Sequence, residues 1–427
     1  MHSRNSVRYY LIVAAVLIFL FFSNDFGLTD VQKTAIVMAA GIDREGPTFI
    51  LTAQIAVPQS SDQGEQAQAV QIESRGETVA EAFNQINAKT GWYPKLVFCN
   101  LLVLGEDTIK SNVFDALDFF IRDEYMSDNC FVAACEGTAK EILNTQTPID
   151  PMSGVAAQKV LSAHAARVGT VAPMTLREFS IGYFNDNKSG YMPILKPESE
   201  QESSGAKGGE GQKQGESGQE EQKSEEGQNA GAFLPYIPAA AGSSTQSAGG
   251  QKAQGEEEKK VFSAAETALF YDGIYADKLD PDETFAFSMV MDKLRLASYT
   301  PVSDGVPYTL IVKHNQPSVK FSVDKNATAK LNIKLKVTAG LQGTAFSQSV
   351  HEMANSGNVP EKVFEDASKD LTEKITRVFE KSKKTKCDIF NVVGRLKKFE
   401  NKYFSAFHEN LLDRLVFSVN VRFDSLR

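Results

Sequence analysis

Three acidic residues, Asp280, Asp282 and Glu283, gather around Pro281 and are candidates for acid–base chemistry. Two neighbouring carboxylates can serve as general acid and general base when their surroundings separate their pKa values. Asp and Pro are also the usual residues of a turn or of a helix start. We interpret the group as such a turn or helix start rather than as a catalytic pair.

The histidines offer no stronger site. None has a partner at the spacing of a metal site or a catalytic pair, and the HExxH, GxSxG and P-loop motifs are absent. One of them lies in a run of alanines on a predicted helix, where a surface or boundary position is expected. The sequence therefore predicts no catalytic residue and no cofactor-binding residue, and the chain is expected not to be an enzyme. The histidines are His2, His164 (the one among alanines), His314, His351 and His408.

The four cysteines form no CxxC pair and no Cys/His cluster at zinc-ligand spacing, so no metal site is predicted. Cys130 and Cys135 lie in an apolar run with strand character. An odd separation on a strand directs two side chains to opposite faces, which argues against a disulfide between them. Cys99 and Cys387 complete the set, and all four are predicted to be packing residues.

The negative charge of the chain is concentrated in one segment. Of the formal charge of -9, two thirds comes from residues 198–228, which carry nine Glu against three Lys. The remainder is close to neutral, so the chain lacks the basic face that nucleic-acid binding requires. No nucleic-acid partner is predicted.

The same segment marks a break in the organisation of the chain. Between residues 198 and 229 the single apolar residue is Ala206, in a background of Glu, Gln, Gly, Ser and Lys. Such a composition cannot bury enough apolar surface to offset the entropy lost on ordering. We predict a disordered linker over residues 197–260, interrupted by a short apolar island at Phe233–Ala240.

An apolar segment opens the chain. Tyr9–Phe22 is an unbroken apolar run preceded by Arg4 and Arg8, an arrangement that keeps the N-terminus cytoplasmic and exports the residues after the run. Its length suits either the core of a signal peptide or a transmembrane helix continued through Leu28. Because no small-x-small cleavage site comes after it, we favour an uncleaved membrane anchor over residues 1–28, with a cleaved signal peptide and a buried helix as alternatives. The bulk of the chain is then extracytoplasmic.

Residues 29–196 alternate between strand and helix patterns after an opening hairpin. In Thr48–Val57 apolar residues recur at every second position, which predicts a half-buried strand. Thr78 with Glu81, and Thr138 with Glu141, have the spacing of capping boxes at helix starts. The other expected strands are 34–42, 96–104 and 130–135, and the expected helices include 109–121, 155–167 and 176–184.

Residues 261–427 form a second mixed region. Pro360–Lys381 carries one apolar helix face, and the basic stretch Lys381–Lys386 lies where it would either compensate the helix dipole or touch a membrane surface. The chain ends in the alternating strand Val416–Phe423. The two halves together predict an α+β protein of more than one domain, with mixed sheets and packed helices. The other expected strands are Phe285–Met291, Tyr308–Lys313, Val319–Val323 and Lys330–Val337.

Short motifs that are typical of turns, helix caps and strands occur in a distinctive order along both halves of the chain. In the first half they are Gly41-Ile42-Asp43, Val57-Pro58, Arg122-Asp123 and Gly137–Leu143. In the second half they are Thr267–Gly273, Lys278-Leu279, Asp282-Glu283-Thr284, and Cys387–Phe390 with Gly394 after it. Their order and spacing resemble the Ger(x)C family, the C subunits of spore germinant receptors, over nearly the whole chain except the linker.

This resemblance implies a non-enzymatic subunit that acts with two polytopic membrane subunits, of the A and B types, in a nutrient receptor on the inner membrane of a spore. Relatives usually begin with a lipoprotein signal, whereas the first cysteine here is Cys99. Tyr9–Phe22 is therefore expected to supply the anchor itself. The long polar insert is unusual for the family and leaves the relative placement of the two halves open.

Two other functions remain compatible with the same residues. One is a membrane-anchored scaffold or binding protein of the envelope of growing cells, which the timing of expression would separate from a spore receptor subunit. The other is a secreted hydrolase with an unrecognised site, which would require a deep polar cleft with converging carboxylates or a histidine pair.

Overall fold

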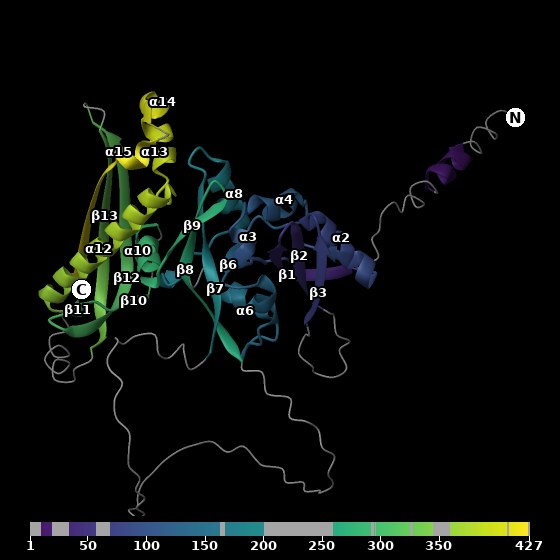
Figure 1. Ribbon diagram of the computed structural model, residues 1–427, viewed down its shortest axis with the longest axis horizontal. Coiled ribbons are helices and arrows are strands. Elements are labelled where there is room, and N and C mark those ends of the chain that lie inside the picture. Colours follow the sequence, from purple (N-terminus) through teal and green to yellow (C-terminus); the bar gives the residue numbers. More distant parts are fainter. Residues whose placement is uncertain are drawn as a thin grey trace, which may run out of the picture.

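The computed structural model contains two β-sheets with helices packed on them (Figure 1). This arrangement confirms the predicted α+β class. The linker prediction lies almost wholly outside the described residues, as do His2, His164, His351 and His408. The structure describes residues 10–18, 34–56, 69–162, 167–199, 259–291, 294, 296–324, 328–344, 359–407 and 410–425.

The first sheet has nine strands in the order β3-β2-β1-β5-β6-β7-β8-β9, with β4 paired beside β1. Strands β1, β5, β6 and β7 are parallel, whereas the strands at both ends of the sheet pair antiparallel. A parallel centre is typical of a sheet that is covered on both faces. The strands are β1 (Thr34–Glu45), β2 (Thr48–Ala56), β3 (Ala69–Gly76), β4 (Tyr93–Lys95), β5 (Leu101–Leu104), β6 (Phe131–Cys135), β7 (Ser189–Ser199), β8 (Lys260–Tyr271) and β9 (Ile274–Leu279).

Helices cover both faces of this sheet. On one face α2, α4 and α8 bury their apolar residues against alternate strand residues such as Ile42 and Leu51. On the opposite face α5 and α6 pack against the other set, which includes Val103 and Leu195. The helices are α2 (Val79–Thr90), α3 (Glu106–Ile109), α4 (Phe114–Arg122), α5 (Ala139–Asn144), α6 (Ser153–Val160) and α8 (Leu176–Phe184).

The prediction of a half-buried second strand is wrong, because β2 is buried on both faces. Thr52 and Gln54, which lie between the apolar residues of the predicted pattern, are 2% and 1% exposed. Gln54 lies beneath α6, where its Nε2 donates to Ser153 Oγ at 2.9 Å and its Oε1 accepts from Gly154 N at 2.9 Å. A buried polar side chain that is fully paired in this way reads in sequence as a solvent-facing one.

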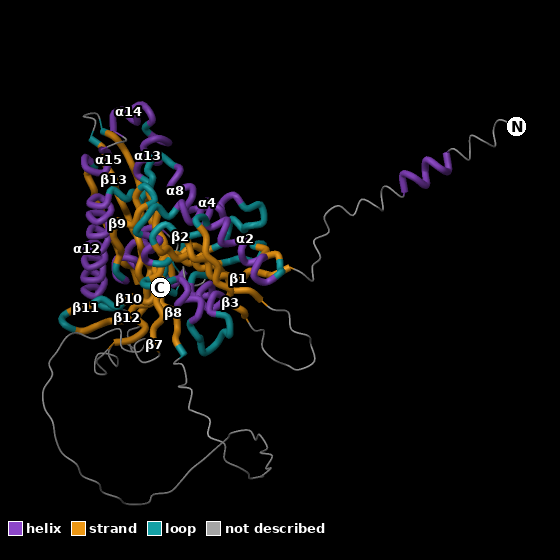
Figure 2. Tube along the Cα trace, turned by 45° about the vertical axis from the view of Figure 1, so that its right-hand side comes forward, coloured by secondary structure: helices purple, strands orange, loops and turns teal. Residues whose placement is uncertain are grey.

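The second sheet has the order β10-β12-β13-β14, with β11 paired to β12. Figure 2 shows the long helix α12 lying alongside these strands. Its predicted apolar face, from Val363 to Val378, is buried against the sheet, which confirms that helix. The elements are α10 (Pro281–Met291), β10 (Ala297–Tyr299), β11 (Val302–Ser303), β12 (Val306–Val323), β13 (Ala329–Thr344), α12 (Glu361–Thr385), α13 (Val392–Phe399), η2 (Asn401–Tyr403), α14 (Phe404–Phe407), α15 (Leu411–Arg414) and β14 (Val416–Ser425).

The first sheet continues across the linker. Strand β7 precedes the linker and β8 comes after it, yet the two are antiparallel neighbours, with Ser199 paired to Lys260. The predicted break between residues 196 and 261 is therefore not a break in the sheet. The intervening residues connect two adjacent strands, as the loop of a very long hairpin would.

Two expectations in the first half are corrected. The single helix expected over 109–121 is two helices, α3 and α4, because Asn112 Oδ1 accepts from Phe114 N and so starts a new helix. The strand expected over 96–104 is confined to β5. The residues before it form a turn that is closed by a hydrogen bond from Cys99 N to Leu96 O at 2.8 Å.

Two expectations in the second half are also corrected. Phe285–Met291, expected as a strand, belongs to helix α10, which is buried on all sides and so lacks a one-sided apolar stripe. The strands expected at 308–313 and 319–323 are one continuous strand, β12. It runs through Pro317, which pairs in register with Leu335 of β13.

Residues 10–18, within the predicted anchor, form an exposed helix, and the remainder of Tyr9–Phe22 lies outside the described residues. Among the described residues no helix is both long enough and apolar enough to cross a membrane. The anchor therefore stays a prediction.

Candidate functional site

Asp43, near the end of β1, caps helix α5. Its Oδ1 accepts from Ala139 N at 2.7 Å and its Oδ2 accepts from Lys140 N at 3.0 Å. Burial raises the pKa of this carboxyl above its ordinary value, and the two backbone N–H groups oppose that rise. Gly105 lies against it, and a Cβ there would collide with Asp43 Oδ1. Two of the motifs that resemble the family, the one around Asp43 and the one around Ala139, are thus in direct contact in the fold.

Asp388 makes a second long-range contact, between the two halves of the chain. Its carboxylate accepts from Val392 N and Val393 N, both at 2.8 Å, and so caps helix α13. Its own backbone N–H donates to Ser189 Oγ at the start of β7. Complete burial raises the pKa of this carboxyl to about 6, against the opposing effects of the backbone donors and of Arg395.

Cys387 extends the same contact into the first sheet. Its thiol lies 3.2 Å from the carbonyl oxygen of Phe270 in β8 and 3.4 Å from that of Gly190 in β7. Burial raises the pKa of the thiol to about 12, so it is held as a neutral packing group. The segment Cys387–Phe390 therefore packs the second half of the chain against the first sheet.

The carboxylates around Pro281 start helix α10. Asp280 Oδ1 accepts from Glu283 N at 2.8 Å, and Glu283 Oε2 accepts from Asp280 N at 3.0 Å, which is a reciprocal cap. Glu283 also pairs with Lys381 of α12 at 2.5 Å, and Asp282 pairs with Lys374. Every one of these carboxylates has a structural partner, so the interpretation as a helix start is confirmed.

The other candidate residues do not converge. His314 is the one histidine within the described stretches, and its Nε2 lies 3.2 Å from Gln316 Nε2 on the surface of β12. The four cysteines are free and buried, as the prediction of packing residues required. In the part of the chain that the structure describes, no three His, Cys, Asp or Glu side chains are placed to hold a metal ion.

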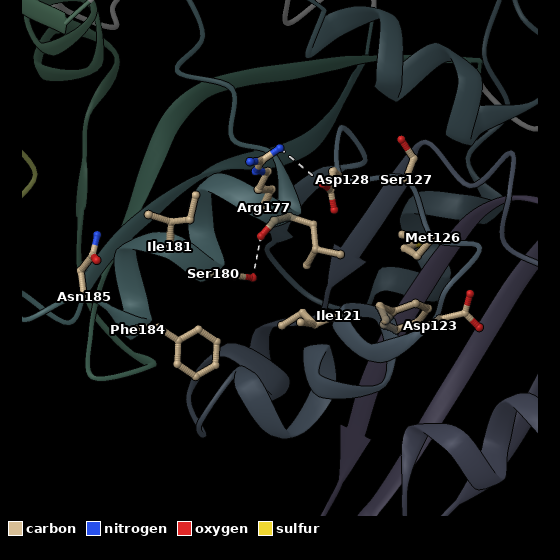
Figure 3. Close-up of a pocket in the computed structure, with 12 residues that line it drawn as sticks. Ile121, Asp123, Met126, Ser127, Asp128, Arg177, Ser180, Ile181, Phe184 and Asn185 are labelled. Atoms are coloured by element: carbon tan, nitrogen blue, oxygen red, sulfur yellow. Dashed lines mark hydrogen bonds and ion pairs between the residues drawn. The ribbon is translucent and has the colours of Figure 1, made fainter.

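A surface pocket of about 360 Å³ lies between α4 and α8 (Figure 3). The two helices are held together by Phe114, which stacks on Phe179 and on Tyr183. Beyond this contact Ile121 and Phe184 line the pocket. Phe184 is 71% exposed, which is unusual for a large apolar side chain.

The polar groups of the pocket surround this apolar part. Figure 3 shows Arg177 and Asp128 joined at the top of the view, an exposed ion pair of 3.4 Å. Ser180 Oγ donates to the backbone oxygen of Leu176, and Ser127 Oγ accepts from Asn129 N. None of the side chains drawn is a histidine or a cysteine, and both serine hydroxyls are engaged with backbone groups. The arrangement can bind a group with an apolar part and a polar end.

The sequence pointed to one edge of this pocket and missed the rest. The Arg122-Asp123 motif lies at the end of α4, and Asp123 lines the pocket. Ile121, the last residue of the helix expected over 109–121, is 36% exposed. Helix α8 buries Leu176 and Phe179, whereas Ile181 and Phe184 form a second apolar stripe. That second stripe is the signal that could have located the pocket.

Comparison with known proteins matches both halves of the chain to families. Residues 28–197 match the family described as "Spore germination protein N-terminal domain", and residues 265–425 match "Spore germination B3/ GerAC like, C-terminal". The chain belongs to the Ger(x)C family. The N-terminal match ends within β7 and the C-terminal match begins within β8, so the two Ger(x)C domains share one sheet in this structure.

The individual Ger(x)C proteins that match this chain share less than a third of their aligned residues with it. The spore germination protein KC of Bacillus subtilis (strain 168) is 28% identical over 161 residues, which span 35% of this chain and 39% of that protein. The match thus covers about two fifths of the length of this curated relative. The crystal structure of the GerBC protein aligns at 14% identity with a TM-score of 0.48, over 91% of this chain and 97% of that chain.

Proposed function

We propose that this chain is the C subunit of a nutrient germinant receptor, non-enzymatic and anchored in the inner membrane of the spore by Tyr9–Phe22. The observation that carries the proposal is the pair of family matches, which fall in order on both halves of the chain. The bulk of the chain is extracytoplasmic in this proposal, and its partners are two polytopic membrane subunits of the A and B types.

The use of the polar residues favours a binding role. The carboxylates of Asp43, Asp280, Glu283 and Asp388 are all engaged in helix caps. Each of them therefore has a structural role at the start of a helix. The pocket between α4 and α8 has an apolar part and an ion pair, which suit a non-covalent contact with a ligand or with a partner side chain.

The anchor is supported by the sequence alone. Tyr9–Phe22 is apolar and comes after two arginines, and no cysteine precedes Cys99. Apolar burial of this segment in the bilayer would replace the acyl chains of a lipoprotein. Retention in the membrane is then independent of lipoprotein processing.

Germination assays test the proposal. The gene is deleted in a strain whose other nutrient receptors have been removed, and spores are exposed to single nutrients while the loss of optical density is monitored. We expect no nutrient response without the gene and full recovery when the wild-type gene is restored. A trigger that bypasses nutrient receptors is the control, and it should act equally in all strains.

An unchanged nutrient response in the deleted strain would overturn the proposal. Protein that is present in growing cells and absent from spores would favour an envelope scaffold instead.

A further inference from the structure

Large apolar side chains are exposed near the end of the first sheet at which β1 begins. They lie just after the end of α2 and around the short strand β4, and the loop after α4 adds one more. We call this set the aromatic patch. It consists of Trp92, Tyr93, Val97, Phe98 and Tyr125, which are between 38% and 54% exposed.

A contact through Lys95 brings the two segments that carry the patch together. Residues 92–98 are continuous in the chain, and Lys95 Nζ lies 4.5 Å from the centre of the Tyr125 ring. Neighbouring buried residues, Leu96 and Cys99, are 1% and 0% exposed and fix the turn from the inside. The outward side chains are therefore presented on a rigid base. Exposed apolar surface that is held in this way marks a place of interaction.

The patch lies where the chain leaves for the predicted anchor. Thr34, the first residue of β1, pairs in parallel with Tyr93 of β4, so the two backbones are about 5 Å apart. Twelve residue steps separate Phe22 from Thr34. A fully extended chain of this length spans at most about 40 Å. An anchor in the bilayer thus keeps the end of the sheet where β1 begins within that distance of the membrane.

The chemistry of the patch suits the interfacial zone of a bilayer. Trp and Tyr are the residues enriched at the level of the lipid headgroups, because their rings are apolar and their N–H and O–H groups are polar. A long cationic side chain such as Lys95 can reach outward to headgroup phosphates. Glu124 beside Tyr125 adds a negative charge, so the apolar side chains, rather than net positive charge, would provide the attraction.

We propose that the aromatic patch rests in the headgroup zone of the membrane that holds the anchor, and that it orients the first sheet against the bilayer. This rests on the membrane anchor of the proposed function. The occupant is a lipid surface.

Trp92 provides the test, because it is the single tryptophan of the chain. The full-length protein is reconstituted in phosphatidylcholine vesicles with and without a lipid brominated near its headgroup. We expect a blue-shifted Trp92 emission, quenching by the brominated lipid, and protection from iodide in the aqueous phase. The same result is expected when phosphatidylglycerol is added, because the contact is chiefly apolar.

A variant and a matched control sharpen the result. Phe98→Asp combined with Val97→Asp should abolish quenching by the brominated lipid while the protein stays with the vesicles. Phe399→Asp changes a side chain that is 61% exposed on α13 and should leave the quenching unchanged.

Three results would overturn the proposal. If the wild-type protein stays with the vesicles and Trp92 is as accessible to iodide there as in detergent, the proposal for the aromatic patch is wrong, whereas the proposal for the anchor is unaffected. If Trp92 becomes shielded only when the two polytopic subunits are added, the patch is a protein interface. If alkaline carbonate removes the protein from the vesicles, the anchor fails, and the patch proposal fails with it.

Discussion

Two buried aspartates connect segments that are far apart in the sequence. Asp43 caps a helix 96 residues further along, and the backbone of Asp388 reaches a serine 199 residues earlier. In each case the carboxylate accepts two backbone N–H groups at the first turn of a helix, where negative charge is favoured. These residues therefore stabilise contacts between elements as well as single helices.

Removal of the Asp43 side chain should destabilise the fold. In Asp43→Ala the N–H groups of Ala139 and Lys140 lose their acceptor in a buried place, which should lower the free energy of unfolding by about 2–4 kcal/mol. Urea unfolding of the full-length protein in detergent measures this. Asp128→Ala, which removes an exposed ion pair, is the control and should change stability by less than about 0.5 kcal/mol. Equal losses in the two variants would contradict the role of Asp43.

Asp388 should make stability depend on pH. Its folded pKa of about 6 lies above its ordinary value of 3.8, so the folded state binds the proton more tightly than the unfolded state does. The stabilisation from the protonated form is thus present below about pH 4 and is lost as the pH rises through about 6. A difference of about two pKa units corresponds to about 3 kcal/mol.

The measurement compares wild type with Asp388→Asn by urea unfolding between about pH 4 and about pH 7. The wild type should lose up to about 3 kcal/mol relative to the variant over this interval. Parallel curves would show that the protonation of Asp388 is not linked to folding.

At the residue scale the sequence predicted some of this. Asp43 and Asp388 both lie in motifs that resemble the family. The capping box at Thr138 and Glu141 is confirmed with both of its hydrogen bonds. At Thr78 the cap is confirmed, but Glu81 accepts from Glu77 N instead of completing the box. The long-range partners of Asp43 and Asp388 had no local signal, because they are brought together by the sheet.

At the scale of elements, helix α10 joins the two halves of the protein. It comes after β9 of the first sheet and packs its buried side chains in the core of the second sheet, where Phe287 lies against Tyr191 and Phe390. The pair between Glu283 and Lys381 fixes its N-terminus to α12, and Glu283 is 5% exposed. The strand pattern expected for this segment failed because a helix that is apolar all round shows no 3.6-residue period.

The ion pair between α10 and α12 should contribute to stability. Glu283→Gln keeps an acceptor for Asp280 N but leaves the half-buried Lys381 ammonium without its countercharge. This should lower the free energy of unfolding by about 1–3 kcal/mol, less than for a fully buried pair.

Asp282→Asn is the matched control in the same turn. It removes a 3.4 Å pair in which the Asp282 side chain is 68% exposed, and a change below about 0.5 kcal/mol is expected from urea unfolding. A larger effect for Asp282 than for Glu283 would show that the α10–α12 contact does not depend on the buried pair.

At the scale of the whole molecule, the polar linker connects neighbouring strands of one sheet. Ser199 and Lys260 are paired, so the two ends of the linker are already held together by β7 and β8. Composition predicts a polar linker over residues 197–260 but not this adjacency, since strand order is decided by packing far from the segment. The same adjacency explains how the relative placement of the halves is fixed despite the long insert.

A shorter linker should therefore leave the fold intact. Replacement of residues 203–256 by a few Gly and Ser residues reduces the loop that β7 and β8 must close. Loop-closure entropy then predicts a gain of about 1–2 kcal/mol in the free energy of unfolding. Urea unfolding and the nutrient response of spores that carry the variant measure the two consequences. Loss of stability would show that the linker contributes contacts to the fold.

The central claim is that this chain works as one subunit of a membrane receptor in spores. The most direct test is affinity purification of the full-length tagged chain from detergent-solubilised spore inner membranes, with mass spectrometry of the recovered proteins and an untagged strain as the control. We predict that two polytopic membrane proteins, of the A and B types, are recovered with it. Recovery of the chain without either of them, or its absence from spore membranes, would contradict the claim.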